Sequence, residues 1–236
     1  MKKFTLLLTL TIVVNLAFAQ KKWFTLYTDS IALVKDGNQV STLFENDIKK
    51  IIPNIEFDIK TVLHTTPYLI YYNDNGKEKT ANLPLWEQVI PQQKQFLYQI
   101  AGSEKNGKMV FGLFFNGFYL PHELGHALSA ITKGSIINSY ENEYFANTIA
   151  MLWWRKHKRK KELQMCYEKA KAIWAKLPNP VPDGITIEAF YKENYVKASQ
   201  NPVVYGYMQF RQFIQIYEDK TLPDFDTFIK KYINQR

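Results

Sequence analysis

Two histidines and a glutamate in the stretch HELGH carry the strongest chemical signal in the chain. His122 and His126 are four residues apart, so on a helix they share one face, with Cβ atoms about 5–6 Å apart. Their imidazole nitrogens can then bind one zinc ion at about 2.0–2.1 Å. Glu123, one step round the helix, can act as a general base on a zinc-activated water. Without a metal, the same histidines would be ordinary polar residues on a helix surface.

A catalytic zinc usually takes three protein ligands, so a third group must follow further along the chain. Glu143 and Asn147, in the segment NSYENEYFAN, are again four residues apart and share one face of the next predicted helix. We predict that Glu143 is the third ligand and that Asn147 hydrogen-bonds the second nitrogen of a zinc histidine. Glu141 is the competing ligand, but it faces away from Glu143 and suits the N-terminus of the helix.

The two motifs together resemble the gluzincin group of metallopeptidases, in which HExxH is followed by a second helix carrying NExxxD or NExFA. The resemblance covers residues 111–154 and implies a zincin-like fold, zinc as the cofactor and a peptide bond as the substrate. The glutamate of the second motif is the third zinc ligand in that group and corresponds to Glu143. The residue four later supports a zinc histidine and corresponds to Asn147, where aspartate is common. Ser129 and Thr132 exclude the metzincin pattern.

Sites of this kind also use a strand edge to align the substrate and a polar donor to stabilise the oxyanion. The apolar run KMVFGLFFNG, residues 108–117, is predicted as a short buried strand that could provide this edge. Tyr205 and Tyr207 are the predicted donors, because Gly206 between them permits a close turn. Arg211 is an alternative donor, and the two tyrosines could equally be ordinary core residues.

The segment before this run is predicted to form a small mixed sheet with helices. Alternating branched and aromatic residues predict strands at 56–64 and 67–72, followed by a turn at 73–77. Helical spacing predicts a helix at 41–52 and another at 83–102.

The two metal-binding motifs are predicted on consecutive helices. The first helix covers residues 118–134 and ends at Gly134. The second begins near residue 139 and continues into the 170s, with Asn138 and Glu141 resembling a capping box. A helix–turn–helix of this kind would bring the third ligand back to the two histidines.

The whole chain is predicted to be an α+β protein in three parts. Residues 1–19 are typical of a secretory signal, with Lys2 and Lys3 before an apolar stretch that ends in Ala-Phe-Ala. Residues 20–176 are predicted as the zincin-like metal-binding domain. Residues 177–236, which begin with the breaker cluster LPNPVPDG, are predicted as a helical C-terminal subdomain. We therefore expect a bacterial protein exported to the periplasm or the exterior.

Composition and charge narrow the choice of partners. The 15 Tyr and 16 Phe argue for a packed globule, and the single cysteine, Cys166, cannot form an internal disulfide. Much of the formal charge of +8 lies in the run RKHKRKK at residues 155–161. We interpret this run as a solvated helix face; the alternative is weak contact with an anionic surface, aided by Trp153 and Trp154. The sequence shows no nucleic-acid-binding module.

The leading prediction is an exported zinc metallopeptidase that hydrolyses peptide or protein substrates. The first alternative is a non-catalytic exported binding or scaffold protein with a zincin-like fold. The second is a membrane-surface factor that acts through the tryptophans and the basic run.

Overall fold

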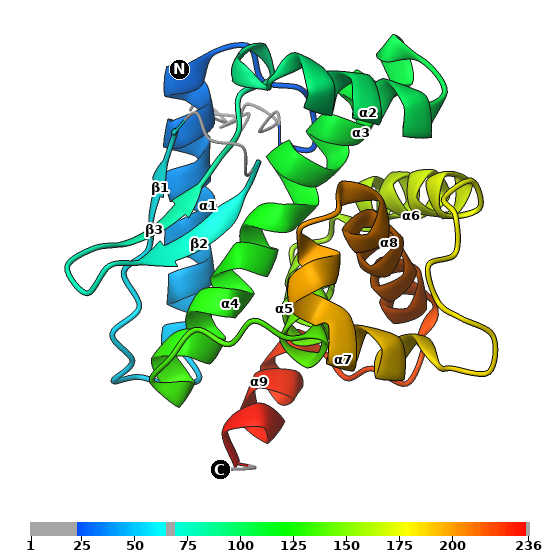
Figure 1. Cartoon of the computed structure of the whole chain (residues 1–236). Coiled ribbons are helices and arrows are strands. Elements are labelled where there is room, and N and C mark those ends of the chain that lie inside the picture. Colours follow the sequence, from blue (N-terminus) through cyan, green and yellow to red (C-terminus); the bar gives the residue numbers. More distant parts are fainter. Residues whose placement is uncertain (1–22, 65–68, 235–236) are drawn as a thin grey trace, which may run out of the picture.

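The computed structural model describes residues 23–64 and 69–234 and shows an α+β chain that is mostly helical (Figure 1). The predicted signal at residues 1–19 lies outside the described residues. The elements run in the order α1 (Ser30–Lys49), β1 (Lys60–Val62), β2 (Tyr71–Asp74), β3 (Lys79–Asn82), η1 (Trp86–Gln88), α2 (Pro91–Ala101), α3 (Glu104–Leu113), η2 (Phe114–Phe118), α4 (Tyr119–Lys133), α5 (Tyr140–Lys156), α6 (Lys160–Trp174), α7 (Ile187–Ser199), α8 (Pro202–Glu218) and α9 (Phe225–Asn234). None of the described helices combines the length and apolar character needed to cross a bilayer.

Helix α1 begins eleven residues before the predicted start at Ser41. Its N-cap is Asp29, whose Oδ1 accepts the backbone N–H groups of Ile31 and Ala32 at 2.8 and 3.1 Å. Gly37 inside the helix lowers the helix propensity of its first turns, which is why the spacing predicted only the second half.

The small sheet has the strand order β1-β3-β2, with β1 parallel and β2 antiparallel to β3. The mixed sheet expected in the N-terminal part is present, but β3, which follows the predicted turn, was missed. The predicted strand at 67–72 lies partly outside the described residues, and its described end falls in β2. Strand β2 is an edge strand, and it lies beside α4 (Figure 1).

Residues 108–117 are helical, so the prediction of a buried strand was wrong. Helix α3 continues through the π-helical turn η2 into α4. The run is buried around most of its surface: Val110, Phe111, Leu113 and Phe114 are each at most 1% exposed. An apolar segment buried on all sides has no periodicity that distinguishes a helix from a strand, which explains the error.

The π-helical turn is held by the N-terminal segment of the described chain. Asn116 departs from helical geometry, with φ −105° and ψ 23°. Its side-chain amide donates to the carbonyl of Pro84 at 3.0 Å, and its backbone carbonyl accepts the N–H of Phe24 at 3.0 Å. Trp23 donates its indole N–H to the carbonyl of Gly117 at 3.0 Å. These bonds fix the start of α4, the helix that carries HELGH.

The single long helix predicted from residue 139 is two helices, α5 and α6. The break occurs at Lys158, whose φ of 60° is left-handed. The N–H of Arg159 then bonds the carbonyl of Trp154 at 3.0 Å, which closes α5 in a Schellman-type turn. The left-handed residue at such a helix end is usually glycine. Because Lys158 occupies this position here, the sequence did not indicate that α5 ends.

The N-terminus of α5 is capped by Ser139, not by Asn138. Ser139 Oγ accepts the N–H of Asn142 at 3.2 Å. The predicted capping box of Asn138 and Glu141 was therefore wrong by one residue, within the usual uncertainty of helix ends.

Helices α8 and α9 share the main core, whereas the buried residues of α7 belong to a second, smaller cluster. Phe213 of α8 packs against Phe118 with ring centroids 4.7 Å apart, and Phe225 at the start of α9 packs against Phe44 of α1 at 5.9 Å. The division into a metal-binding domain and a C-terminal subdomain at residue 177 stays a prediction.

The basic run begins with side chains that serve the fold. Arg155 donates to the carbonyls of Ile216 and Tyr217 near the end of α8 at 3.3 and 2.9 Å. Trp153 and Trp154 are 0% and 3% exposed. Both tryptophans are core residues and are therefore not available to contact a membrane surface, as the predicted membrane-surface role required.

Candidate metal centre

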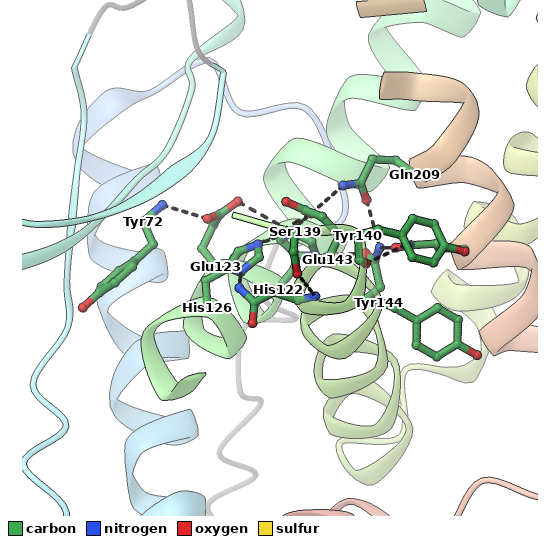
Figure 2. A network of polar contacts seen from close by, with 12 residues as sticks. Tyr72, His122, Glu123, His126, Ser139, Tyr140, Glu143, Tyr144 and Gln209 are labelled. Carbon is green, nitrogen blue, oxygen red and sulfur yellow. Dashed lines mark hydrogen bonds and ion pairs between the residues drawn. The ribbon is translucent and has the colours of Figure 1, made fainter. Parts of the chain in front are cut away.

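His122, His126 and Glu143 converge at one point between α4 and α5 (Figure 2). The Nε2 atoms of the two histidines are 3.0 Å apart, and Glu143 Oε2 lies 3.3 Å from the first and 3.6 Å from the second. His122 and Glu143 are buried, and the His126 side chain is 15% exposed. Three lone-pair donors at this separation can hold one metal ion.

The close approach of α4 and α5 at Gly125 makes this convergence possible. A Cβ atom at Gly125 would lie 3.0 Å from Ala146 Cα and 3.2 Å from Ile149 Cβ. A side chain there would push α5 away, and α5 carries the third donor, Glu143. The glycine in HELGH thus gives α5 room to approach α4 this closely.

The outer nitrogen of each histidine has an amide partner on α5. His122 Nδ1 lies 2.9 Å from Asn147 Oδ1. His126 Nδ1 lies 2.9 Å from Asn142 Nδ2, which also donates to the carbonyl of Ile137 at 2.7 Å. Asn147 and Asn142 thus contact the two histidines from α5, and the role predicted for Asn147 beside a zinc histidine stays a prediction.

Glu123 lies beside the three donors but is held by a different element. Its Oε2 accepts the backbone N–H of Tyr72 in β2 at 2.7 Å, and its Oε1 is 4.0 Å from His122 Nε2 (Figure 2). Burial raises the pKa of Glu123, and the nearby charges of His122 and His126 oppose that rise. The carboxylate is thus positioned by backbone, next to the donors and outside the group of three.

Both oxygens of Glu143 accept hydrogen bonds from the C-terminal helices. Tyr195 of α7 donates its hydroxyl to Oε1 at 2.6 Å, and Gln209 of α8 donates its amide to Oε2 at 2.6 Å. Although burial acts to raise the pKa of Glu143, His126 and His122 hold it well below the ordinary value. A lowered pKa favours the ionised carboxylate, the form that binds a cation.

The predicted oxyanion donors differ in their distance from the three candidate ligands: Tyr205 lies near them, whereas Tyr207 and Arg211 pack against Trp174. Burial and the charges of Glu143 and Tyr195 raise the pKa of Tyr205, so its hydroxyl lies near the centre. Tyr207 packs against Trp174 at 5.4 Å between ring centroids, and Arg211 stacks over the same ring at 5.3 Å. Of these residues, Tyr205 is the one next to the centre.

Four residues of the centre were not identified from the sequence: Tyr72, Asn142, Tyr195 and Gln209. Tyr72 acts through its backbone, so its side chain gives no signal. Asn142 precedes Glu143 directly and was within reach of the motif argument. Gln209, with Gln212, interrupts an apolar helix face with buried polar groups, and such groups need partners. This interruption was the signal that could have found it.

Two imidazoles and a carboxylate suit zinc, and imidazole also suits copper, iron and nickel. The chain therefore contains a buried group able to hold a metal ion, with no particular metal selected. No family model, curated protein or solved structure matches the chain. Any function of this centre has to be argued from its geometry and chemistry.

Proposed function

We propose that the protein is a zinc-dependent metallopeptidase of the gluzincin type. The main support is the position of Glu123, which lies beside His122 at 4.0 Å without being one of the three candidate ligands. The N–H of Tyr72 holds one of its carboxylate oxygens. The other oxygen remains directed toward the histidines, where a general base can take the proton of an attacking water.

A zinc ion held by His122, His126 and Glu143 would lower the pKa of water and polarise a peptide carbonyl. The surrounding protein groups would transfer the proton and stabilise the developing negative charge. Glu123 accepts the proton of the water and passes it to the leaving nitrogen. The Tyr195 hydroxyl, which touches Glu143, can turn to donate to the oxygen on which negative charge develops.

A peptide substrate is supported by the place of β2. Among the residues that the structure describes, this strand pairs with β3, and the N–H of Tyr72 points away from β3 toward Glu123. An extended peptide can add to such an edge through backbone hydrogen bonds. The strand edge predicted at residues 108–117 is helical, and β2 is the element that can take its role.

The test compares Glu123→Gln with wild type in zinc content and in cleavage of a peptide library. We expect stoichiometric zinc in both and a rate of hydrolysis about 10²–10⁴-fold lower in the variant, because only the general base is lost. Glu141→Gln is the matched control, since Glu141 is an exposed glutamate on α5. Purified protein that takes up no zinc, or equal cleavage by Glu123→Gln, overturns the proposal.

The burial of the centre favours a second candidate, a non-catalytic exported protein with a structural metal. Glu123, His122 and Glu143 are 3–6% exposed, and Tyr195 closes over Glu143. This candidate predicts that zinc raises the unfolding temperature while neither wild type nor Glu123→Gln cleaves any library peptide. The same two measurements thus separate the two candidates.

We also propose that the protein acts outside the cytoplasm, because residues 1–19 have the pattern of a secretory signal. N-terminal sequencing of the protein recovered from its producing cell should then begin near Gln20. Recovery of a chain that still begins at Met1 contradicts export by cleavage of this signal.

A further inference from the structure

Three buried side-chain amides form a chain that leads from α8 to His122. Asn147 Nδ2 lies 2.9 Å from Gln209 Oε1 and 2.9 Å from Gln212 Oε1. On its other side, Asn147 Oδ1 lies 2.9 Å from His122 Nδ1. The three amides are 0–4% exposed, so they have no solvent to pair with.

The orientation of each amide follows from its fixed neighbours. Gln212 Nε2 lies 3.1 Å from the backbone carbonyl of Tyr140, which can only accept. Gln212 must therefore present Nε2 to that carbonyl and Oε1 to Asn147. Gln209 is oriented in the same way, because its Nε2 donates to the Glu143 carboxylate at 2.6 Å. Two acceptors thus face Asn147, and only its NH₂ group can meet both.

The orientation of Asn147 in turn determines the state of His122. With Nδ2 committed to the two glutamines, Asn147 Oδ1 faces the imidazole as an acceptor. His122 Nδ1 must then carry the ring proton, and Nε2 keeps its lone pair. That lone pair faces His126 and Glu143.

We propose that Gln209 and Gln212 are positioning residues that fix His122, through Asn147, in the tautomer that can bind a metal through Nε2. The inference rests on the metal site of the proposed function but not on peptide hydrolysis. The orientation of the two glutamines also accounts for the asparagine at position 147, where gluzincins often have aspartate. An aspartate at 147 would set its carboxylate against two glutamine carbonyl oxygens.

His126 provides an internal comparison. Asn142 Nδ2 donates to the carbonyl of Ile137, and the same nitrogen faces His126 Nδ1. A donor there requires His126 Nδ1 to accept, so the ring proton of neutral His126 lies on Nε2, toward His122. The two histidines of one motif should therefore be opposite tautomers in the metal-free protein, and only His122 is already arranged for a metal.

The test reads both tautomers by long-range ¹H–¹⁵N NMR of the metal-free protein, at a pH where both imidazoles are neutral. We expect the Nδ1–H form for His122 and the Nε2–H form for His126 in wild type. Gln212→Met should populate the Nε2–H form of His122 and weaken zinc binding, measured by chelator competition, by about tenfold or more. Gln215→Met, on α8 one turn away, is the matched control and should change neither quantity.

An Nε2–H tautomer of His122 in wild type overturns the proposal without any variant. A His122 tautomer and zinc affinity unchanged in Gln212→Met also overturn it. If Gln212→Met does not fold, Asn147→Asp takes its place, and zinc affinity equal to wild type there counts against the proposal. Absence of peptide cleavage bears on the proposed function alone, because neither readout depends on catalysis.

Discussion

Replacing Gly125 by alanine should destabilise the protein although alanine is the better helix former. The substitution gains about 1 kcal/mol of helix propensity inside α4. The new Cβ would however lie 3.0 Å from Ala146 Cα and 3.2 Å from Ile149 Cβ. Ala146 Cα is a backbone atom, so α5 itself must shift, and overpacking of this kind costs about 1–3 kcal/mol.

Gly206→Ala in α8 separates the two contributions. A Cβ at Gly206 meets only Leu177 Cδ1, at 4.0 Å, so its gain of about 1 kcal/mol in helix propensity is unopposed. The difference in free energy of unfolding between the two variants then measures the overpacking alone. We expect Gly125→Ala to be the less stable variant by about 1–3 kcal/mol.

The assay is urea unfolding of the metal-free proteins in chelator, with midpoints compared at equal m values. The chelator is needed because a metal that binds only the folded state would add its own stabilisation. The Gly125→Ala variant should also bind zinc more weakly than wild type, because α5 carries Glu143, whereas Gly206→Ala should not. Equal stabilisation of both variants would refute the close approach of α4 and α5 as the reason for the glycine.

Two further predictions concern Asp47 and Tyr195. Burial acts to raise the pKa of Asp47, but hydrogen bonds from His157 and Lys50 lower it from 3.8. The stabilisation that the ionised Asp47 gives the fold is therefore present above pH 3.8 and is lost as the pH falls through the folded pKa. Urea midpoints measured from neutral pH downward should therefore fall less steeply below pH 3.8 in Asp47→Asn than in wild type, and equal slopes would count against this cluster. On the proposed function, Tyr195→Phe should lower kcat on a cleaved peptide by about 10²–10³-fold with zinc content unchanged, because the proposed oxyanion donor is lost while His122, His126 and Glu143 remain. An unchanged kcat would leave Tyr195 only as a neighbour of Glu143.

The parts of the fold predicted well are those with a local cause. Helix α4 follows from its apolar spacing and ends, as predicted, with Gly134 in a left-handed conformation at φ 77°. The parts predicted wrongly depend on distant neighbours. The run at 108–117 is mostly buried and so lacks the periodicity that would identify a helix, and the end of α5 at Lys158 has no glycine to mark it.

The residues of the candidate site also fall into those that a local sequence pattern identifies and those that depend on distant elements. His122, His126, Glu143 and Asn147 could be selected from the sequence because helical spacing places them on facing surfaces of two adjacent helices. Apart from Asn142 on α5, the groups that complete the site come from separate elements that no local pattern connects to the motif: the backbone of β2 and side chains of α7 and α8. Tyr205 was selected for its neighbouring glycine, whereas Tyr195 on α7 is the tyrosine that contacts Glu143.

The candidate metal centre therefore depends on the C-terminal helices as much as on the two motifs. Glu143 is held from α7 by Tyr195 and from α8 by Gln209, and Asn147 is oriented by Gln209 and Gln212. A chain ending before residue 177 would keep every predicted ligand and still lose these contacts. Both carboxylate oxygens of Glu143 and the amide of Asn147 would then need new partners, since buried polar groups without partners are costly. HELGH and NEYFAN supply the donor atoms, and residues beyond 177 set the orientation in which they can act together.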